Sequence, residues 1–286
     1  MIAIDWLLLA LLVGQSDASA STPADQLQAL HRGEAESWRM FVDESRQREA
    51  KLNVKPIYIW TNPTRSGGQH GTVYVWLHKG RPVVIGSIFS HPELGKRMIC
   101  HELHSLATGK LLPERERASE TWQPKASIEM LPLPGAPPAE SAPLRRMTQM
   151  RAISKEFAAH SIDYQKERWE LRLLPQPMYR YEKPQGDVVD GAIFAFVTSA
   201  GTDPEIVLVF EARKKGDALA WYYRAIRFSD SDLHLQYAGK EIFSSIRDDK
   251  NQLYFNPDHT YRLFRDRAID ELPELATPTA ADKGKP

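Results

Sequence analysis

The stretch that decides the fold is Pro56-Ile-Tyr-Ile-Trp-Thr-Asn-Pro63, which recurs with the same prolines and aromatic slots as Pro177-Met-Tyr-Arg-Tyr-Glu-Lys-Pro184. A second pair follows at the same offset: Gly71-Thr-Val-Tyr-Val-Trp-Leu77 and Gly191-Ala-Ile-Phe-Ala-Phe-Val197. The copies are about 120 residues apart, and a supersecondary unit repeated along a chain sets its architecture. The pattern predicts two similar units, and it does not specify their chemistry.

Each unit opens with a helical pattern and continues with strand patterns. Apolar residues recur at helical spacing over residues 33–52 and again over residues 145–169. Strand candidates follow at 56–60, 72–78, 83–89 and 98–106, and then at 178–181, 192–197, 205–210 and 221–228. Turn residues separate neighbouring strands, which favours an antiparallel order. The predicted fold class is α+β, with two similar units, each a helix followed by an antiparallel β-meander, joined by a Pro-rich linker.

Composition sets the expected boundaries. Residues 1–20 are assigned to a signal peptide, 30–110 to the first helix-plus-meander unit and 145–265 to the second. Residues 111–144 contain many prolines, which deny the backbone its donors, so this segment is predicted to be an extended, partly docked linker. Residues 266–286 are rich in proline, alanine and lysine and are predicted to be a disordered tail.

The N-terminus has the pattern of an export signal. An apolar run of eight residues ends at Val13, and the small residues Ala18-Ser19-Ala20 follow it as a cleavage site. We expect cleavage near Ala20 and an extracytoplasmic location, either periplasmic or secreted. Asp5 and the lack of lysine or arginine before the run argue against this interpretation. An uncleaved short anchor and a buried N-terminal segment remain alternatives.

Charge and cysteine content narrow the function classes. The 286 residues contain 37 lysines and arginines and 37 aspartates and glutamates, so no net field attracts nucleic acid or an anionic membrane. The single cysteine cannot form an internal disulfide. We find no glycine-rich phosphate loop, nucleophile elbow or CxxC motif, and we predict no cofactor and no membrane span in the mature chain.

Alternation along the strands predicts sheets that are apolar on both faces, one aliphatic and one aromatic. The helix is expected on the aliphatic face, and the aromatic face requires another cover: the other unit's sheet, the Pro-rich linker or a ligand that stacks on rings. The weak ligand-binding candidates are therefore Tyr58, Trp60, Tyr74, Trp76, Tyr179 and Tyr181.

Residues 98–106 contain the strongest concentration of reactive side chains. On a strand, Cys100, Glu102 and His104 project from one face and His101 from the other, with about 7 Å between successive members. Cys100, Glu102 and His104 are weak catalytic candidates, although neighbouring side chains on one strand are poorly placed to activate each other. The order His-Glu-Leu-His differs from the helical zinc motif, so no metal site is predicted. The carboxylates of Asp203-Pro-Glu205 are assigned to turn chemistry.

Several stretches resemble a family of uncharacterised, predicted-secreted proteins of planctomycete-type bacteria. The resemblance covers roughly residues 33–230 and rests on Arg172-Leu-Leu-Pro-Gln-Pro-Met-Tyr-Arg-Tyr181, Asp190-Gly-Ala-Ile-Phe-Ala-Phe196, Gly201-Thr-Asp-Pro-Glu205, Trp60-Thr-Asn-Pro63, Trp76-Leu-His-Lys-Gly-Arg-Pro82 and His101-Glu-Leu-His-Ser105. It implies export and a layout of two units. It implies no catalytic residue.

The functional expectation is an exported, soluble binding or structural module of the cell envelope, with no identifiable catalytic site. Its partner would be a small molecule, a glycan or an envelope protein. The alternative is an extracytoplasmic hydrolase or transferase with a site near His101, Glu102 and His104. The sequence leaves enzymatic activity undecided and favours the non-enzymatic role.

Overall fold

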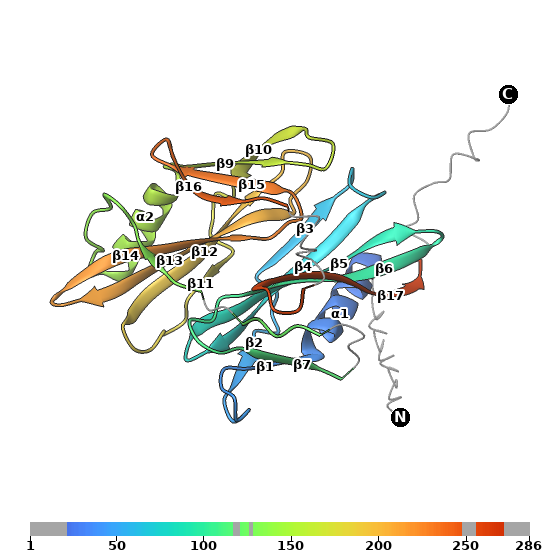
Figure 1. Ribbon diagram of the computed structural model, residues 1–286, viewed down its shortest axis with the longest axis horizontal. Coiled ribbons are helices and arrows are strands. Elements are labelled where there is room, and N and C mark those ends of the chain that lie inside the picture. The colour runs from blue at the N-terminus through green and yellow to red at the C-terminus, as the bar shows by residue number, and fades with distance from the viewer. Residues whose placement is uncertain (1–21, 117–120, 126–127, 248–255, 272–286) are drawn as a thin grey trace, which may run out of the picture.

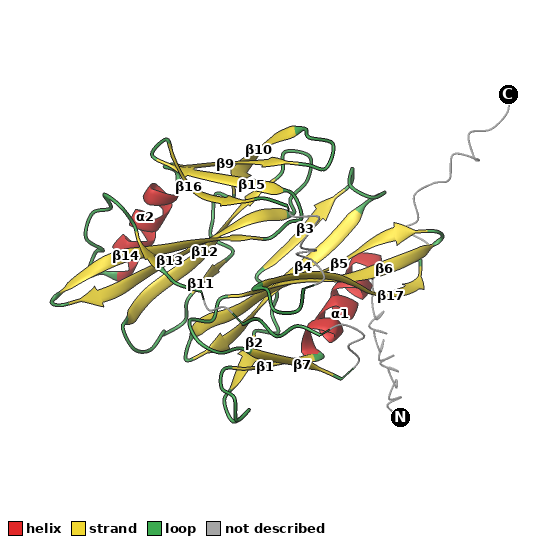
Figure 2. Cartoon of the chain, viewed as in Figure 1, coloured by secondary structure: helices red, strands yellow, loops and turns green. Residues whose placement is uncertain are grey.

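The computed structural model describes residues 22–116, 121–125, 128–247 and 256–271. Strands account for 51% of the described residues and helices for 11%. The predicted α+β class, with two helix-plus-meander units, is therefore wrong. The protein is mostly β, and its strands form two curled antiparallel sheets (Figure 2).

The first sheet combines the N-terminal strands with the last strand of the chain. Its members are β1 (Trp38–Phe41), β2 (Glu49–Leu52), β3 (Tyr58–Asn62), β4 (Gln69–His78), β5 (Arg81–Glu93), β6 (Lys96–Ser105), β7 (Leu112–Arg115) and β17 (Tyr261–Asp270). Their order is β17-β6-β5-β4-β2-β1-β7, and β3 pairs with β4. Because β17 returns to pair with β6, the end of the described chain closes an edge of the sheet that the chain began.

The second sheet is formed by the middle of the chain. Its members are β8 (Leu131–Pro132), β9 (Phe157–Ile162), β10 (Arg168–Leu173), β11 (Tyr179–Arg180), β12 (Val188–Val197), β13 (Pro204–Lys215), β14 (Ala218–Arg227), β15 (Asp232–Tyr237) and β16 (Lys240–Ser245). Their order is β16-β15-β9-β10-β12-β13-β14-β8, and β11 pairs with β12.

The two sheets pack through their aliphatic faces (Figure 1). The shared core takes residues from both: Val73, Val75, Ile85, Ile193, Ala195, Val197, Val207 and Val209. Helix α1 (Pro23–Glu36) packs on the other face of the first sheet, and α2 (Pro143–Ser154) packs on the other face of the second. The layers are therefore helix, sheet, sheet and helix, and both faces of each sheet are covered, as the apolar alternation predicts.

The helices cover the faces opposite to those expected. Tyr74 and Trp76 share a buried cluster with Ala35 of α1, and Phe194 and Phe196 share one with Met150 of α2. The prediction that the helices lie on the aliphatic faces is wrong. Flat aliphatic surfaces meet sheet to sheet, and the larger aromatic rings fill the space around each helix.

Strand pairing also separates the aromatic candidates. Tyr58 lies opposite Val73, and Trp60 lies opposite Gly71, so these two rings are on the aliphatic face of the sheet. Tyr179 and Tyr181 belong to the same shared core. The predicted single aromatic face is therefore divided between two environments.

Both predicted helices are misplaced relative to the structure. Helix α1 ends at Glu36, and β1 and β2 occupy much of residues 33–52. Helix α2 ends at Ser154, and β9 and β10 occupy most of the rest of residues 145–169. Burial in β9 alternates strictly between buried and less buried residues, which is the period of a strand.

The remaining segments connect and cover the sheets. The Pro-rich segment 111–144 contains β7 and β8, and it buries Trp122, Ile128 and Met130. Strand β17 continues to Asp270, inside the range assigned to the tail. The signal peptide assigned to residues 1–20 lies outside the described residues, as does the tail from residue 272. Among the described residues, no helix has the length and apolar character needed to cross a membrane.

Candidate functional site

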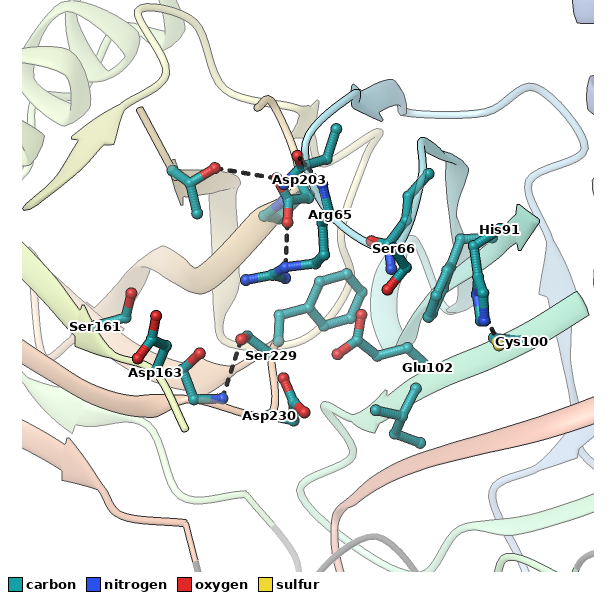
Figure 3. Close-up of a pocket in the computed structure, with 18 of the residues that line it drawn as sticks. Arg65, Ser66, His91, Cys100, Glu102, Ser161, Asp163, Asp203, Ser229 and Asp230 are labelled. Carbon is teal, nitrogen blue, oxygen red and sulfur yellow. Dashed lines mark hydrogen bonds and ion pairs between the residues drawn. The ribbon is translucent and has the colours of Figure 1, made fainter. Parts of the chain in front are cut away.

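A cavity of about 820 Å³ lies where one end of the first sheet meets the second. Eight segments line it, and their residues are Trp60, Asn62, Thr64, Arg65, Ser66, Gln69, Phe89, His91, Cys100, Glu102, Ser161, Asp163, Tyr164, Trp169, Thr198, Ala200, Asp203, Pro204, Phe228, Ser229, Asp230, Ser231, Arg247, Leu263, Phe264 and Arg265. Trp60, Phe89, Phe228 and Leu263 form an apolar wall. We call this space the intersheet cavity (Figure 3).

The loop after β3 forms a polar clamp between the two sheets. The Asn62 side-chain oxygen accepts hydrogen bonds from the backbone N–H groups of Thr64 and Arg65, which shapes a tight turn. The turn aims the Arg65 guanidinium at the second sheet, where it donates to Asp203 Oδ2 and Glu205 Oε1, each at 2.9 Å. Burial disfavours the Arg65 charge, but the charges of Glu205 and Asp203 outweigh burial and raise its pKa.

Asp203 accepts hydrogen bonds through both of its carboxylate oxygens. Its Oδ1 accepts hydrogen bonds from Asn62 Nδ2 at 2.9 Å and from the Thr198 hydroxyl at 3.1 Å. Nearby, the backbone N–H of Thr202 donates to the Thr61 carbonyl at 2.9 Å. These bonds join β3 to the loop before β13, so the clamp positions one wall of the intersheet cavity against the other.

Glu102 provides an acid group at the cavity surface. Its Oε1 accepts a hydrogen bond of 2.6 Å from the Tyr261 hydroxyl, and only 7% of the residue is exposed. Burial, with the charges of Asp230 and Glu205, raises the pKa of Glu102 to about 8. Figure 3 shows Glu102 pointing toward the middle of the cavity, with Arg65 and Asp230 facing it. At neutral pH this side chain is mostly a neutral acid that can both donate and accept.

Cys100 lies on the same wall as Glu102, and its thiol is not activated. Its Sγ is 3.9 Å from Nδ1 of His91. Burial raises the pKa of the Cys100 thiol to about 12, and burial also lowers the pKa of His91. A neutral thiol beside a neutral imidazole is a weak nucleophile at neutral pH.

The structure separates the four candidates of residues 98–106. Cys100, Glu102 and His104 do project from one face of β6, as the alternation predicts. Cys100 and Glu102 line the intersheet cavity, whereas His104 lines a different, smaller cavity. His101 projects from the opposite face toward α1 and belongs to neither cavity. The hypothesis that these residues form one catalytic column receives no support from this arrangement.

His101 belongs to a buried charge network under α1. One of its ring nitrogens and one carboxylate oxygen each from Glu34 and Asp266 lie within 4.8 Å of one another, a spacing that could suit a metal ion. However, Arg115 forms ion pairs with both carboxylates, and Arg267 pairs with Glu34. The charge that would attract a cation is already neutralised.

The tautomer of His101 also argues against a metal there. The Trp38 indole N–H, which can only donate, lies 3.1 Å from His101 Nδ1, so this nitrogen must be the acceptor. In a neutral imidazole, Nε2 then carries the proton and points toward Glu34 Oε2 at 3.6 Å. A protonated nitrogen cannot ligate a metal, and the donor set fits a salt-bridge network instead.

The six aromatic candidates for ligand binding also lie in different surroundings. Of the six, all of which lie in described segments, Trp60 lines the intersheet cavity. Tyr58, Tyr179 and Tyr181 pack in or against the shared core, and Tyr74 and Trp76 pack beneath α1. Of the six weak ligand-binding candidates, Trp60 is therefore the one that lines the intersheet cavity.

Sequence reasoning missed most of the cavity. Arg65 occupies a turn, Asp203 was assigned to turn chemistry, and Phe89 and Leu263 look like ordinary strand residues. These positions are far apart in the chain: the pairing of β17 with β6 brings Leu263 to the cavity, and the contact between the two sheets brings Arg65 to Asp203. One signal was present: Asp203 sits next to Pro204 and Glu205, a carboxylate pair beside a strand.

Comparisons of this chain with models of protein families, with characterised proteins and with solved structures find no match.

Proposed function

We propose that this protein is an exported binding protein that holds a small amphipathic molecule in the intersheet cavity. The observation that carries the proposal is the size and position of this cavity, about 820 Å³ between two closely packed sheets. The cavity is open to solvent, since its lining includes Tyr164, which is 74% exposed, so a ligand can enter it. Its volume lies in the range of small-molecule pockets.

The lining indicates the kind of ligand. Trp60, Phe89 and Leu263 provide surface for an apolar or ring-shaped body. The polar end carries groups of both signs, with the guanidinium groups of Arg65, Arg247 and Arg265 beside the carboxyl groups of Asp163, Asp203, Asp230 and Glu102. Of these, the protonated acid of Glu102 and the carboxylate of Asp230 can accept hydrogen bonds from hydroxyls or amines of a ligand. We therefore expect an apolar body with a hydroxyl- or amine-bearing head.

We also propose that the protein is exported, which would place it in the cell envelope or outside the cell. The support for export is the apolar run that ends at Val13, followed by Ala18-Ser19-Ala20, and the resemblance to predicted-secreted proteins. N-terminal sequencing of protein recovered from the producing bacterium should find a mature start just after Ala20. A start at Met1 in cytosolic protein would contradict this part.

The hydrolase or transferase alternative has weaker support. Its residues His101, Glu102 and His104 face three different surroundings, and the Cys100 thiol has no charged base beside it. Nucleophilic catalysis needs a nucleophile and a base within hydrogen-bond reach.

Binding of N-phenyl-1-naphthylamine, an uncharged aromatic amine whose fluorescence rises in apolar sites, tests the proposal. We expect saturable binding of one probe per chain. Leu263→Gln removes one apolar group from the cavity wall and should weaken binding by about fivefold or more. The matched control Leu144→Gln changes a residue that is 81% exposed on α2 and should leave binding unchanged. Absence of saturable binding, or equal binding by Leu263→Gln, would contradict the proposal.

A further inference from the structure

A second cavity, of about 330 Å³, lies beside the part of the β14 edge that pairs with no other described strand. Strand β8 pairs with β14 at Tyr222 and Tyr223, and the cavity adjoins the residues that continue beyond this pairing. Its lining includes Ile128, Arg224, Arg227, Phe243, Asp258 and Tyr261. We call this space the β14-edge cavity.

Arg227 is buried in this cavity wall with an incomplete set of partners. Only 4% of the residue is exposed. Its Nε donates to the Ser245 hydroxyl at 2.9 Å, and its Nη2 donates to the Ser231 carbonyl at 3.0 Å. The Tyr261 ring lies 5.7 Å from the guanidinium carbon. Nη1 is buried and has no hydrogen-bond partner. All of these partners are uncharged.

Arg224 adds a second guanidinium to the same cavity. Its Nε is likewise buried without a hydrogen-bond partner. In the part of the chain that the structure describes, neither Arg224 nor Arg227 has a carboxylate within 4.0 Å. A buried charge without a counter-charge is strongly unfavourable, so the buried Arg227 guanidinium, with the partly exposed Arg224 guanidinium lining the same cavity, favours an anion there.

The acidic and basic neighbours do not supply this anion. Among the described residues of the lining, Asp258 is the carboxylate, and its Oδ2 already pairs with Lys125. Glu102 is on the far side of Tyr261 and is mostly protonated at neutral pH, since its pKa is about 8. His104 donates through Nδ1 to the Ser105 carbonyl. Burial, followed by the charges of Arg224 and Arg227, lowers the pKa of His104 to about 4, so its ring is uncharged.

We infer that the β14-edge cavity is a binding site for a small oxyanion, such as phosphate or the phosphoryl group of a small organic molecule. The Arg227 Nη1–H and the Arg224 guanidinium are the donors, because planar guanidinium groups match the spacing of oxyanion oxygens. Phe243 and Ile128 provide apolar surface for an organic body beside the anion. The site is separate from the intersheet cavity and does not depend on the function proposed for it.

Calorimetric titration of the full chain with inorganic phosphate, at constant ionic strength set by chloride, tests this site. We expect one saturable site in the wild type. Arg224→Gln should weaken phosphate binding by about tenfold or more, because it removes a charge-assisted donor. The matched control Arg145→Gln removes the same charge from a side chain that is 76% exposed on α2, and it should bind phosphate as the wild type does.

Arg227→Gln should abolish binding, but this buried change can also unfold the protein, so circular dichroism must accompany it. Arg224 is partly exposed, so Arg224→Gln should fold and can test the site even if Arg227→Gln does not fold. Phenyl phosphate distinguishes the two sources of the anion: tighter binding than inorganic phosphate indicates an organic phosphate, and equal binding indicates the free ion. Wild type without a saturable phosphate site, or equal losses in Arg224→Gln and Arg145→Gln, would overturn the inference.

Discussion

At the scale of single residues, Glu102 is the group whose surroundings differ most from water. The Tyr261 hydroxyl donates to its carboxyl group, and the acid retains its proton to a pKa of about 8. In the unfolded chain it would release that proton near pH 4.5. Since the folded state binds the proton more tightly, stability should fall as the pH rises towards 8.

The buried histidines act in the opposite direction below pH 6.5. Burial lowers the pKa of His31 to about 3 and of His104 to about 4, whereas both titrate near 6.5 when unfolded. Stability should therefore rise with pH up to about 6.5, after which these histidines contribute no further change. In the interval from pH 6.5 to 8, the raised pKa of Glu102 therefore sets the direction in which stability changes.

We therefore expect the free energy of unfolding to decrease by about 1–2 kcal/mol between pH 6.5 and 8. Glu102→Gln mimics the protonated acid and should remove most of this decrease. Urea unfolding followed by tryptophan fluorescence measures both. A wild-type stability that is constant over this interval would contradict the assigned protonation of Glu102.

The Cys100 thiol gives a second prediction at this scale. Only 2% of the residue is exposed, and its pKa is about 12. We expect its reaction with a disulfide reagent at pH 8 to be at least about a hundredfold slower in native protein than in urea-unfolded protein. Similar rates in the two states would show that the thiol is accessible and activated.

At the scale of elements, an aromatic ring from β3 and another from the residue that follows β11 lie over glycines of the long strands beside them. A Cβ atom added to Gly71 would be 2.1 Å from the Trp60 ring, and one added to Gly191 would be 2.5 Å from the Tyr181 ring. Both glycines begin matched stretches of the sequence. The close approach of an aromatic ring explains why each stretch opens with the smallest residue.

Gly71→Ala should destabilise the protein by about 1–3 kcal/mol, because the Trp60 ring must move. The matched control is Gly33→Ala in α1, where an added Cβ has no atom within 4 Å. This control should stabilise the protein by about 0.5–1 kcal/mol, as alanine favours helix interiors. Urea unfolding measures both, and equal effects of the two variants would rule out the ring contact as the cause.

The strand patterns of the sequence predicted the elements better than its helical patterns did. The long strands β4, β5, β12 and β13 fall where alternation and turn residues place them. The helices were misplaced, because Trp38 and Phe41 fit both a helix face and the start of a strand. Short strands such as β1 and β9 depend on pairing partners that local spacing does not reveal.

At the scale of the whole molecule, apolar alternation predicted that both sheet faces are covered, and the structure confirms this. It did not predict what covers each face. Which layer covers each face depends on how well the aliphatic sheet faces pack against each other and how well the aromatic faces pack against the helices. This packing is a property of the assembled layers, and local spacing in the sequence does not reveal it. The intersheet cavity has the same origin: Arg65 meets Asp203, and Leu263 meets Glu102, only after strands from distant parts of the chain pair.

Trp76 tests the assignment of the aromatic face to α1. It is completely buried and packs with Trp38 and Tyr74 in the cluster that α1 covers. Trp76→Ala should cost about 3–5 kcal/mol of stability. Because Trp76 is remote from the intersheet cavity, the folded variant should still bind the naphthylamine probe. A variant that keeps full stability and loses the probe would place Trp76 in the binding site instead.

A crystal structure of the protein with bound N-phenyl-1-naphthylamine tests the central claim most directly. We predict electron density for the probe in the intersheet cavity, with its rings against Trp60, Phe89 and Leu263 and its amine toward Glu102 and Asp203. Density for the probe only on an outer surface, or a cavity closed by side chains in crystals that contain the probe, would contradict the claim.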